Sequence, residues 1–107
     1  QKKKNMAELF EKISICLTNV SSVIRMGSIP YGKCAELETY ARNLPGIIKN
    51  QIGKTKADEL GNILFSAHYI ESAAGKIHGI TDKEPFLKEL EEAAGKFMAL
   101  SNIMRAS

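Results

Sequence analysis

The chain has 107 residues, of which 44% are hydrophobic and 25% are charged. This length and composition fit one folded domain, and they exclude both a disordered chain and two independent cores. Fifteen lysines and arginines against twelve acidic residues give a net charge of +3, which is too small to indicate a nucleic-acid-binding protein by itself.

The first predicted helix covers about residues 5–26. Apolar residues recur there at steps of three and four, which is the spacing of an amphipathic helix. Asn5, with Glu8 three residues later, matches a capping box, and Gly27 supplies the signal for the helix end. Residues 1–4 precede this start, and we expect them to form a disordered basic tail.

The second predicted helix covers about residues 33–52, and Gly53 ends it. Pro45 interrupts its apolar pattern. Because proline has no N–H group and its ring clashes with the preceding turn, Pro45 predicts that this helix is kinked or broken. A break would start a new helical stretch at Pro45.

The third predicted helix covers about residues 56–78, after Thr55 and before Gly79. The fourth opens at Thr81 and has Pro85 in its first turn, where proline is well tolerated. Four amphipathic helices joined by short connections predict an all-α fold, an antiparallel four-helix bundle that forms a single domain.

Several kinds of site are excluded by the residue types that they need. The sequence has no phosphate-binding loop and no Glu-x-x-His pair of the kind that holds metals in bundles, so we expect neither cofactor nor metal. A helix-turn-helix needs a new helix within residues 62–65, where the apolar pattern continues unbroken, so nucleic acid is not an expected partner.

No apolar run could span a membrane, and no secretory signal is visible. Cys16 and Cys34 have neither metal-site nor redox-motif spacing, so we expect reduced thiols in a cytoplasmic protein.

His68 is the candidate functional residue. On a helical projection it lies roughly 110° from the centre of the third helix's apolar face, so we expect it to be at least half exposed. Phe65 and Tyr69 project still further outward, while Gly61, Ser72 and Gly75 keep the neighbouring surface low. These residues predict a contact site for another protein. The alternative is that the two aromatic side chains cover a loop or a subunit interface, with His68 an ordinary boundary residue.

A resemblance to a known family involves the same helix. Residues 67–77, Ala-His-Tyr-Ile-Glu-Ser-Ala-Ala-Gly-Lys-Ile, resemble the phosphorylation-site helix of the histidine-containing phosphotransfer (Hpt) domain family. The matches are the alanine before the histidine, the aliphatic Ile70, the small Ala74 and the apolar Ile77. The resemblance implies a helical bundle that docks a receiver domain in two-component signalling. It also implies that His68 accepts a phosphoryl group.

Two positions depart from that family's pattern. Glu71 stands where the family has lysine, and Ser72 stands where it has glycine. A carboxylate one turn from His68 repels an incoming phosphoryl group, which predicts a degenerate relative. Two hypotheses therefore stay open. One is an Hpt-like bundle that docks a signalling protein and relays a phosphoryl group through His68. The other is a non-catalytic interaction or homo-oligomerisation module in which His68 has no role.

Overall fold

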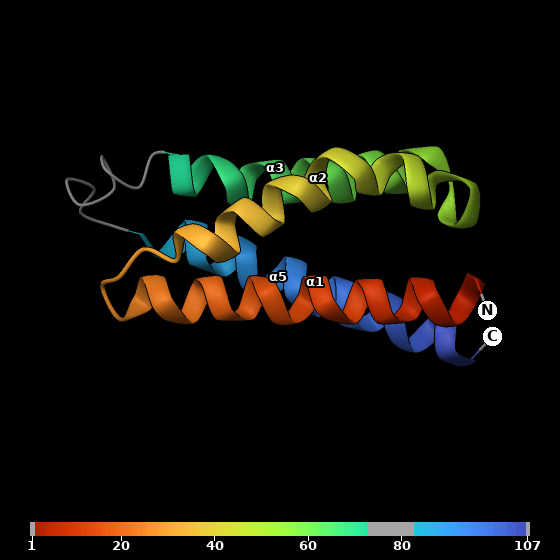
Figure 1. The fold of residues 1–107 in the computed structure, drawn as a ribbon, viewed down its shortest axis with the longest axis horizontal. Coiled ribbons are helices and arrows are strands. Elements are labelled where there is room, and N and C mark those ends of the chain that lie inside the picture. The colour runs from red at the N-terminus through yellow and green to blue at the C-terminus, as the bar shows by residue number, and fades with distance from the viewer. Residues whose placement is uncertain (1, 73–82, 107) are drawn as a thin grey trace.

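The computed structural model describes residues 2–72 and 83–106. Over these residues the chain forms four helices and no strand, and consecutive helices run in opposite directions (Figure 1). The helices are α1 (Lys2–Arg25), α2 (Tyr31–Ile52), α3 (Lys54–Ser72) and α5 (Glu84–Ala106). The predicted all-α antiparallel four-helix bundle is confirmed.

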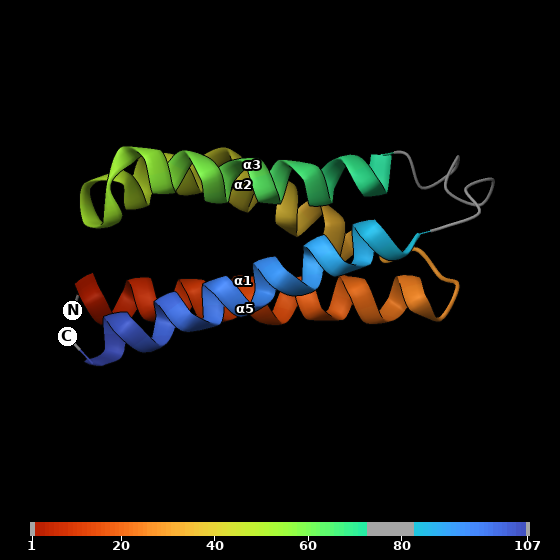
Figure 2. The ribbon, with the colours of Figure 1, turned by 180° about the vertical axis from the view of Figure 1, so that it is seen from behind.

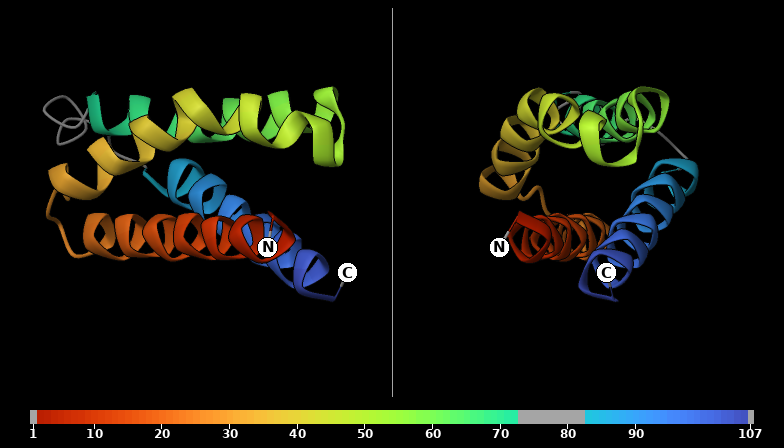
Figure 3. Two further views of the ribbon diagram at one scale, coloured as in Figure 1. Left: turned by 45° about the vertical axis from the view of Figure 1, so that its right-hand side comes forward. Right: turned by 90° about the vertical axis from the view of Figure 1, so that its right-hand side faces the viewer.

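The bundle consists of two helix pairs. α1 packs mainly on α5, and α2 packs mainly on α3. Figure 1 and Figure 3 show the pairs as two layers, with α2 rising from the end of α1 toward α3. The rings of Phe10 and Phe97 lie 5.9 Å apart between α1 and α5. All four helices contribute fully buried side chains to the core, among them Phe10, Ile13, Leu17, Leu37, Leu44, Ile48, Leu60, Leu64, Leu90 and Phe97.

Two buried serines fix the register of the α1–α5 pair. The Ser14 hydroxyl donates a hydrogen bond to the carbonyl oxygen of Ala94 at 2.7 Å, and the Ser101 hydroxyl donates to that of Ala7 at 2.7 Å. Each bond joins a side chain of one helix to the backbone of the other. Small residues at these positions let the two backbones approach closely, and the hydrogen bonds satisfy hydroxyls that burial removes from water.

The start of α1 differs from the expectation. The helix begins at Lys2 and runs through Asn5, so residues 2–4 are helical rather than a disordered tail, and Asn5 is not a cap. Lysine is a good helix former, which allows the first turn to extend. Met6 and Ala7 are buried directly after it, and their packing holds this end of the helix in place.

The connection between α2 and α3 is shorter than expected. Gly53 alone separates the two helices. Its φ of 91° is a backbone conformation that residues other than glycine rarely adopt. α3 therefore begins at Lys54, ahead of the cap expected at Thr55. In α5, Pro85 lies in the first turn, as predicted. The expected end of the third helix at Gly79 and the expected cap at Thr81 lie outside the described residues.

Pro45 lies inside α2 without ending it. Tyr31–Ile52 is a single helix, and Figure 1 shows that it changes direction part-way along, so of the two predicted alternatives the helix is kinked and not broken. Leu44 and Ile48, on either side of Pro45, are both buried in the same core. Their packing keeps the two halves of α2 helical despite the missing backbone hydrogen bond.

The Pro45 ring also sets the distance between α2 and α3. It lies against Gly61 of α3, where a Cβ atom would come within 2.7 Å of the proline Cγ. No real Cβ atom tolerates that distance. Glycine at position 61 is therefore the residue that lets α3 approach the bent part of α2.

Candidate functional site

α3 carries the candidate residues on two different faces. Its buried face consists of small and aliphatic residues, namely Ala57, Leu60, Gly61, Leu64 and Ala67. Phe65 and Tyr69 lie outside this buried face, one turn apart, with 39% and 69% of their surface exposed. The prediction that these two aromatic side chains project into solvent is confirmed.

His68 is more buried than expected. Only 21% of its side chain is exposed, so the expectation of at least half was wrong. The expected exposure was based on a helical projection in which only residues with apolar side chains defined the buried face, and Gly61 was not counted among them. Because Gly61 is in fact part of the buried face and draws α2 close, the residues of α3 that border α2 are covered. The Nδ1 atom of His68 is enclosed by protein.

The other ring nitrogen of His68 faces an acidic residue of α2. Nε2 lies 3.8 Å from a carboxylate oxygen of Glu38, and Glu38 also forms an ion pair with Arg42 one turn later. The imidazole thus takes part in a polar contact between α2 and α3. The Glu38 carboxylate repels a phosphoryl group at Nε2, and the Arg42 guanidinium paired with it offsets part of that repulsion.

The remaining predicted site residues follow His68 along the chain. Glu71 and Ser72 belong to the last turn of α3, but their side chains lie outside the described residues, as does the whole of Gly75. The structure therefore brings together Phe65, Tyr69 and His68 on adjoining faces of one helix. The proposed influence of Glu71 on His68 stays a prediction.

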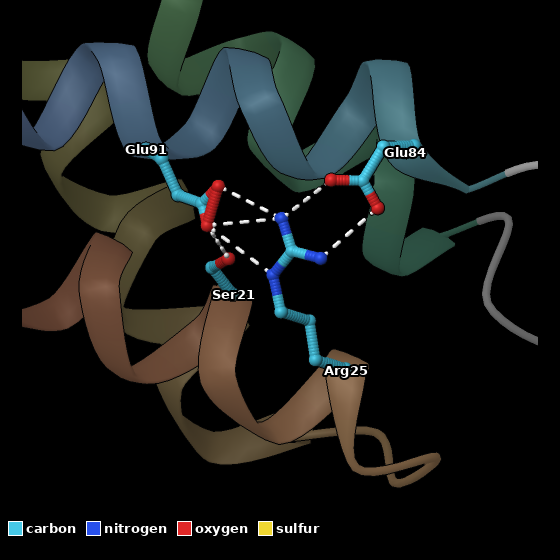
Figure 4. Close-up of polar contacts among 4 residues, drawn as sticks. All are labelled: Ser21, Arg25, Glu84 and Glu91. Atoms are coloured by element: carbon cyan, nitrogen blue, oxygen red, sulfur yellow. Dashed lines mark hydrogen bonds and ion pairs between the residues drawn. The ribbon is translucent and has the colours of Figure 1, made fainter.

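A second polar cluster, which sequence reasoning missed, lies between the end of α1 and the start of α5 (Figure 4). The Arg25 guanidinium donates to both carboxylate oxygens of Glu84 at 2.8 and 3.0 Å and to Glu91 at 2.9 Å, and the Ser21 hydroxyl donates to Glu91 at 3.1 Å. Hydrogen bonds from Arg25 lower the pKa of both Glu84 and Glu91. The sequence does contain a pattern that could have indicated this cluster. Arg25 lies in the last turn of α1 and Glu84 in the first turn of α5, where the helix dipole favours a positive and a negative charge respectively.

The described residues limit the other chemistry that the chain can carry. Within residues 2–72 and 83–106 no group of three or more histidine, cysteine or acidic residues is placed to hold a metal ion. Among the helices of that same part of the chain, none has the length and apolar character needed to cross a membrane. Arg25 and its two glutamates satisfy one another, so this cluster holds helices together rather than offering a reactive group.

Comparisons with known proteins return no match: no family model, no curated protein and no solved structure is similar to this chain. The resemblance of residues 67–77 to the Hpt helix therefore remains a prediction from the sequence. The geometry of α3 and its neighbours is the basis on which a function can be argued.

Proposed function

We propose that this chain is a protein-docking module that binds another protein through the outer face of α3, with Phe65 and Tyr69 at the centre of the contact. The observation that carries the proposal is the exposure of both aromatic side chains on a helix whose inner face is completely buried. Aromatic residues are enriched in protein interfaces and supply much of the binding energy there. Their spacing of one turn offers a continuous apolar strip to a partner.

In this proposal His68 positions α3 and is not a phosphoacceptor. Its Nδ1 is enclosed, and its Nε2 faces the Glu38 carboxylate. A phosphoryl group bound at Nε2 would lie beside that carboxylate. The polar contact with α2 instead supports a structural role that holds α3 in place beneath its docking face.

The proposed partner is a protein of the cytoplasm. Cys16 and Cys34 are both buried thiols and not joined in a disulfide, which fits a reducing compartment. Because of the Hpt resemblance, a receiver domain is the first partner to test. Binding is expected to depend on apolar contact with Phe65 and Tyr69 rather than on the chemistry of His68.

Site-specific photocrosslinking tests the docking face. A photoreactive benzoylphenylalanine replaces Tyr69 in one variant and Asn19, an exposed residue of α1, in a control variant. We expect a protein to crosslink at position 69 and not at position 19, and the crosslink to disappear when Phe65 is changed to serine. Equal crosslinking from both positions would contradict a specific docking face on α3.

Phosphorylation separates this proposal from the phosphotransfer hypothesis. The purified chain and its His68→Ala variant are incubated with phosphorylated receiver domains. We expect no acid-labile label on either protein and unchanged crosslinking of the variant at position 69. An acid-labile label that disappears in His68→Ala would instead favour the phosphoryl relay.

A further inference from the structure

Three separate parts of the chain meet at one end of the bundle. Figure 2 shows the start of α1, the connection between α2 and α3, and the end of α5 there, and the right-hand view of Figure 3 looks onto this end. The hydrogen bond from Ser101 to Ala7 holds the end of α5 beside the start of α1. Lys56 and Ile103 line one cavity, so the start of α3 lies beside the same end of α5. We call this end of the bundle the turn end, and it consists of residues 2–8, 46–60 and 100–106.

The turn end carries an excess of positive charge. Its cationic residues are Lys2, Lys3, Lys4, Lys49, Lys54, Lys56 and Arg105. Its acidic residues are Glu8, Asp58 and Glu59. Seven cations against three anions give this end a net charge of +4, whereas the whole chain has +3. The positive charge of the chain is therefore concentrated at the turn end.

Neighbouring carboxylates do not neutralise this charge. Glu59 pairs with Lys96, which lies outside the turn end, at 3.4 Å. Lys4, Lys49 and Lys56 are exposed. Among the side chains that the structure describes, no carboxylate forms an ion pair with any of these three lysines. Their charge faces solvent without local compensation.

Helix stability does not explain where the lysines lie. Lys2 and Lys4 belong to the first turn of α1, and Lys54 and Lys56 to the first turn of α3, and neither turn contains an acidic residue. The helix dipole favours negative charge at this terminus, so lysines there are less favourable than acidic residues. Like charges gathered at one end also repel one another. Such an arrangement is typical of a surface that attracts an anionic partner.

We propose that the turn end binds the anionic surface of a phospholipid membrane. Contacts with membrane surfaces combine lysines, which attract anionic headgroups, with apolar side chains that enter the headgroup layer. Ile47 and Ile103 have 48% and 58% of their surface exposed. They lie five and three residues from the ends of α2 and α5, roughly 7.5 and 4.5 Å along the helix axes. Both are therefore near enough to the turn end to enter the headgroup layer.

The residue types favour a lipid surface over nucleic acid. Six of the seven cations are lysine, whose point charge suits a diffuse anionic surface. Arginine makes the bidentate contacts that read phosphates and bases, but Arg105 is bound to Glu11 at 2.7 Å. The turn end also contains no aromatic residue on which a base could stack.

The turn end and the docking face of α3 can be occupied together. Phe65 lies eleven residues from Lys54 along α3, roughly 16 Å from the turn end. Membrane binding does not require Phe65 or Tyr69, so it can fail or succeed independently of protein docking.

Vesicle sedimentation tests the proposal. The purified chain is mixed, at about 0.15 M salt, with phosphatidylcholine vesicles that contain either no phosphatidylserine or about one third of it. We expect binding only to the vesicles with phosphatidylserine, and release at 1 M salt, because salt screens exposed charges. Each lysine near an anionic surface contributes roughly fivefold to binding. The turn-end variant, which combines Lys4→Gln, Lys49→Gln and Lys56→Gln, should therefore bind about a hundredfold more weakly.

A second triple variant separates the position of the charge from its amount. Lys12→Gln, Lys33→Gln and Lys88→Gln together remove the same charge from exposed lysines outside the turn end. This control should bind within about twofold of the unmodified chain, because its lysines lie far from the membrane and are screened. Circular dichroism of both variants establishes that the helices are retained.

Three results would overturn the proposal. They are no binding to vesicles with phosphatidylserine, equal binding to vesicles without it, and an equal loss of binding in the two triple variants. A fluorescent DNA duplex in the same buffer should show no binding at micromolar protein. Duplex binding that is lost in the turn-end variant would assign the turn end to nucleic acid instead.

Discussion

At the scale of single residues, the contact between Pro45 and Gly61 decides how closely two helices pack. Proline is usually read as a helix breaker and glycine as a weak point in a helix. Here the ring of one fills the space left by the missing side chain of the other. The two residues therefore act together, and the effect of changing either depends on the other.

Gly61→Ala should destabilise the fold by about 1–3 kcal/mol, because the new Cβ atom meets the rigid Pro45 ring. In a Pro45→Ala background the same change should cost much less, since the ring is gone. Urea denaturation of the two single variants and the double variant measures this coupling.

Gly46→Ala is the matched control for that cycle. Gly46 lies next to Pro45 in α2, but a Cβ atom there meets nothing within 4 Å. This substitution should stabilise the helix by about 0.5–1 kcal/mol, as alanine does at an open helical site. A similar effect of alanine at positions 46 and 61 would mean that the Pro45 ring does not set the helix spacing.

Cys16 is a second residue whose surroundings determine its chemistry. Burial, and to a smaller extent the nearby Glu36 carboxylate, raise the pKa of its thiol to about 11. The thiolate is the reactive form of cysteine, so the native thiol should react very slowly at pH 8. Iodoacetamide should modify Cys16 rapidly only after unfolding in urea, and mass spectrometry of the modified peptide measures the two rates.

The raised pKa of Cys16 also predicts a dependence of stability on pH. The thiol stays protonated in the folded chain to higher pH than in the unfolded chain, whose ordinary value is 9.0. Its contribution to stability is therefore complete below pH 9 and is lost as pH rises toward 11. Cys16→Ala should lose less stability than the unmodified chain between pH 9 and 10. Parallel pH profiles for the two proteins would contradict the buried thiol.

At the scale of helices, Arg25 joins α1 to α5 through two carboxylates with lowered pKa values. Such carboxylates stabilise the fold above their ordinary pKa of 4.5 and lose this contribution as pH falls through their lower folded values. Arg25→Gln should therefore reduce the melting temperature at pH 7. The difference from the unmodified chain should shrink as pH drops below 4.5.

Lys12→Gln controls for the change in net charge, because Lys12 is an exposed residue of the same helix. Its melting temperature should follow that of the unmodified chain across the pH range. Salt at 1 M should also reduce the effect of Arg25→Gln, since the cluster is partly exposed to solvent. A difference that persisted unchanged at pH 3 would show that Arg25 acts through packing rather than charge.

Helix number and type could be predicted from the sequence, since apolar periodicity reports the local repeat directly. The contacts between helices could not. Ser14 and Ser101 look like polar interruptions of apolar faces until α1 and α5 are placed together. Gly61 was expected on the surface, because nothing near it in the chain indicates that Pro45 will lie against it. That error carried over to His68, whose burial depends on how closely α2 approaches.

At the scale of the whole molecule, the two helix pairs differ in the chain length that separates their members. α2 and α3 are joined by one residue, whereas the Ser101–Ala7 bond between α5 and α1 spans 94 residues. Contacts between near neighbours cost less chain entropy to form. We expect the α2–α3 pair to be structured in the folding transition state and the α1–α5 pair to complete afterwards.

Matched leucine substitutions test this order. Leu64 in α3 and Leu17 in α1 are both fully buried. Leu64→Ala should mainly slow refolding, with a φ-value of roughly 0.5 or more, whereas Leu17→Ala should mainly speed unfolding, with a φ-value below about 0.3. Stopped-flow measurements give both values, and the reverse pattern would place the α1–α5 pair first.

The same separation matters while the chain is being synthesised. α1 leaves the ribosome before any other helix described here, yet its main packing partner is α5, which is made after the other three. The apolar face of α1 around Phe10, Ile13 and Leu17, which is buried in the folded chain, therefore stays exposed to solvent until α5 has been synthesised. Ser14 and Ser21 lie within this face, and their hydroxyl groups make it less hydrophobic and less prone to aggregate than a continuous aliphatic surface would be. Replacing them with leucine should reduce the yield of native protein in the cell, because nascent chains would aggregate before α5 arrives.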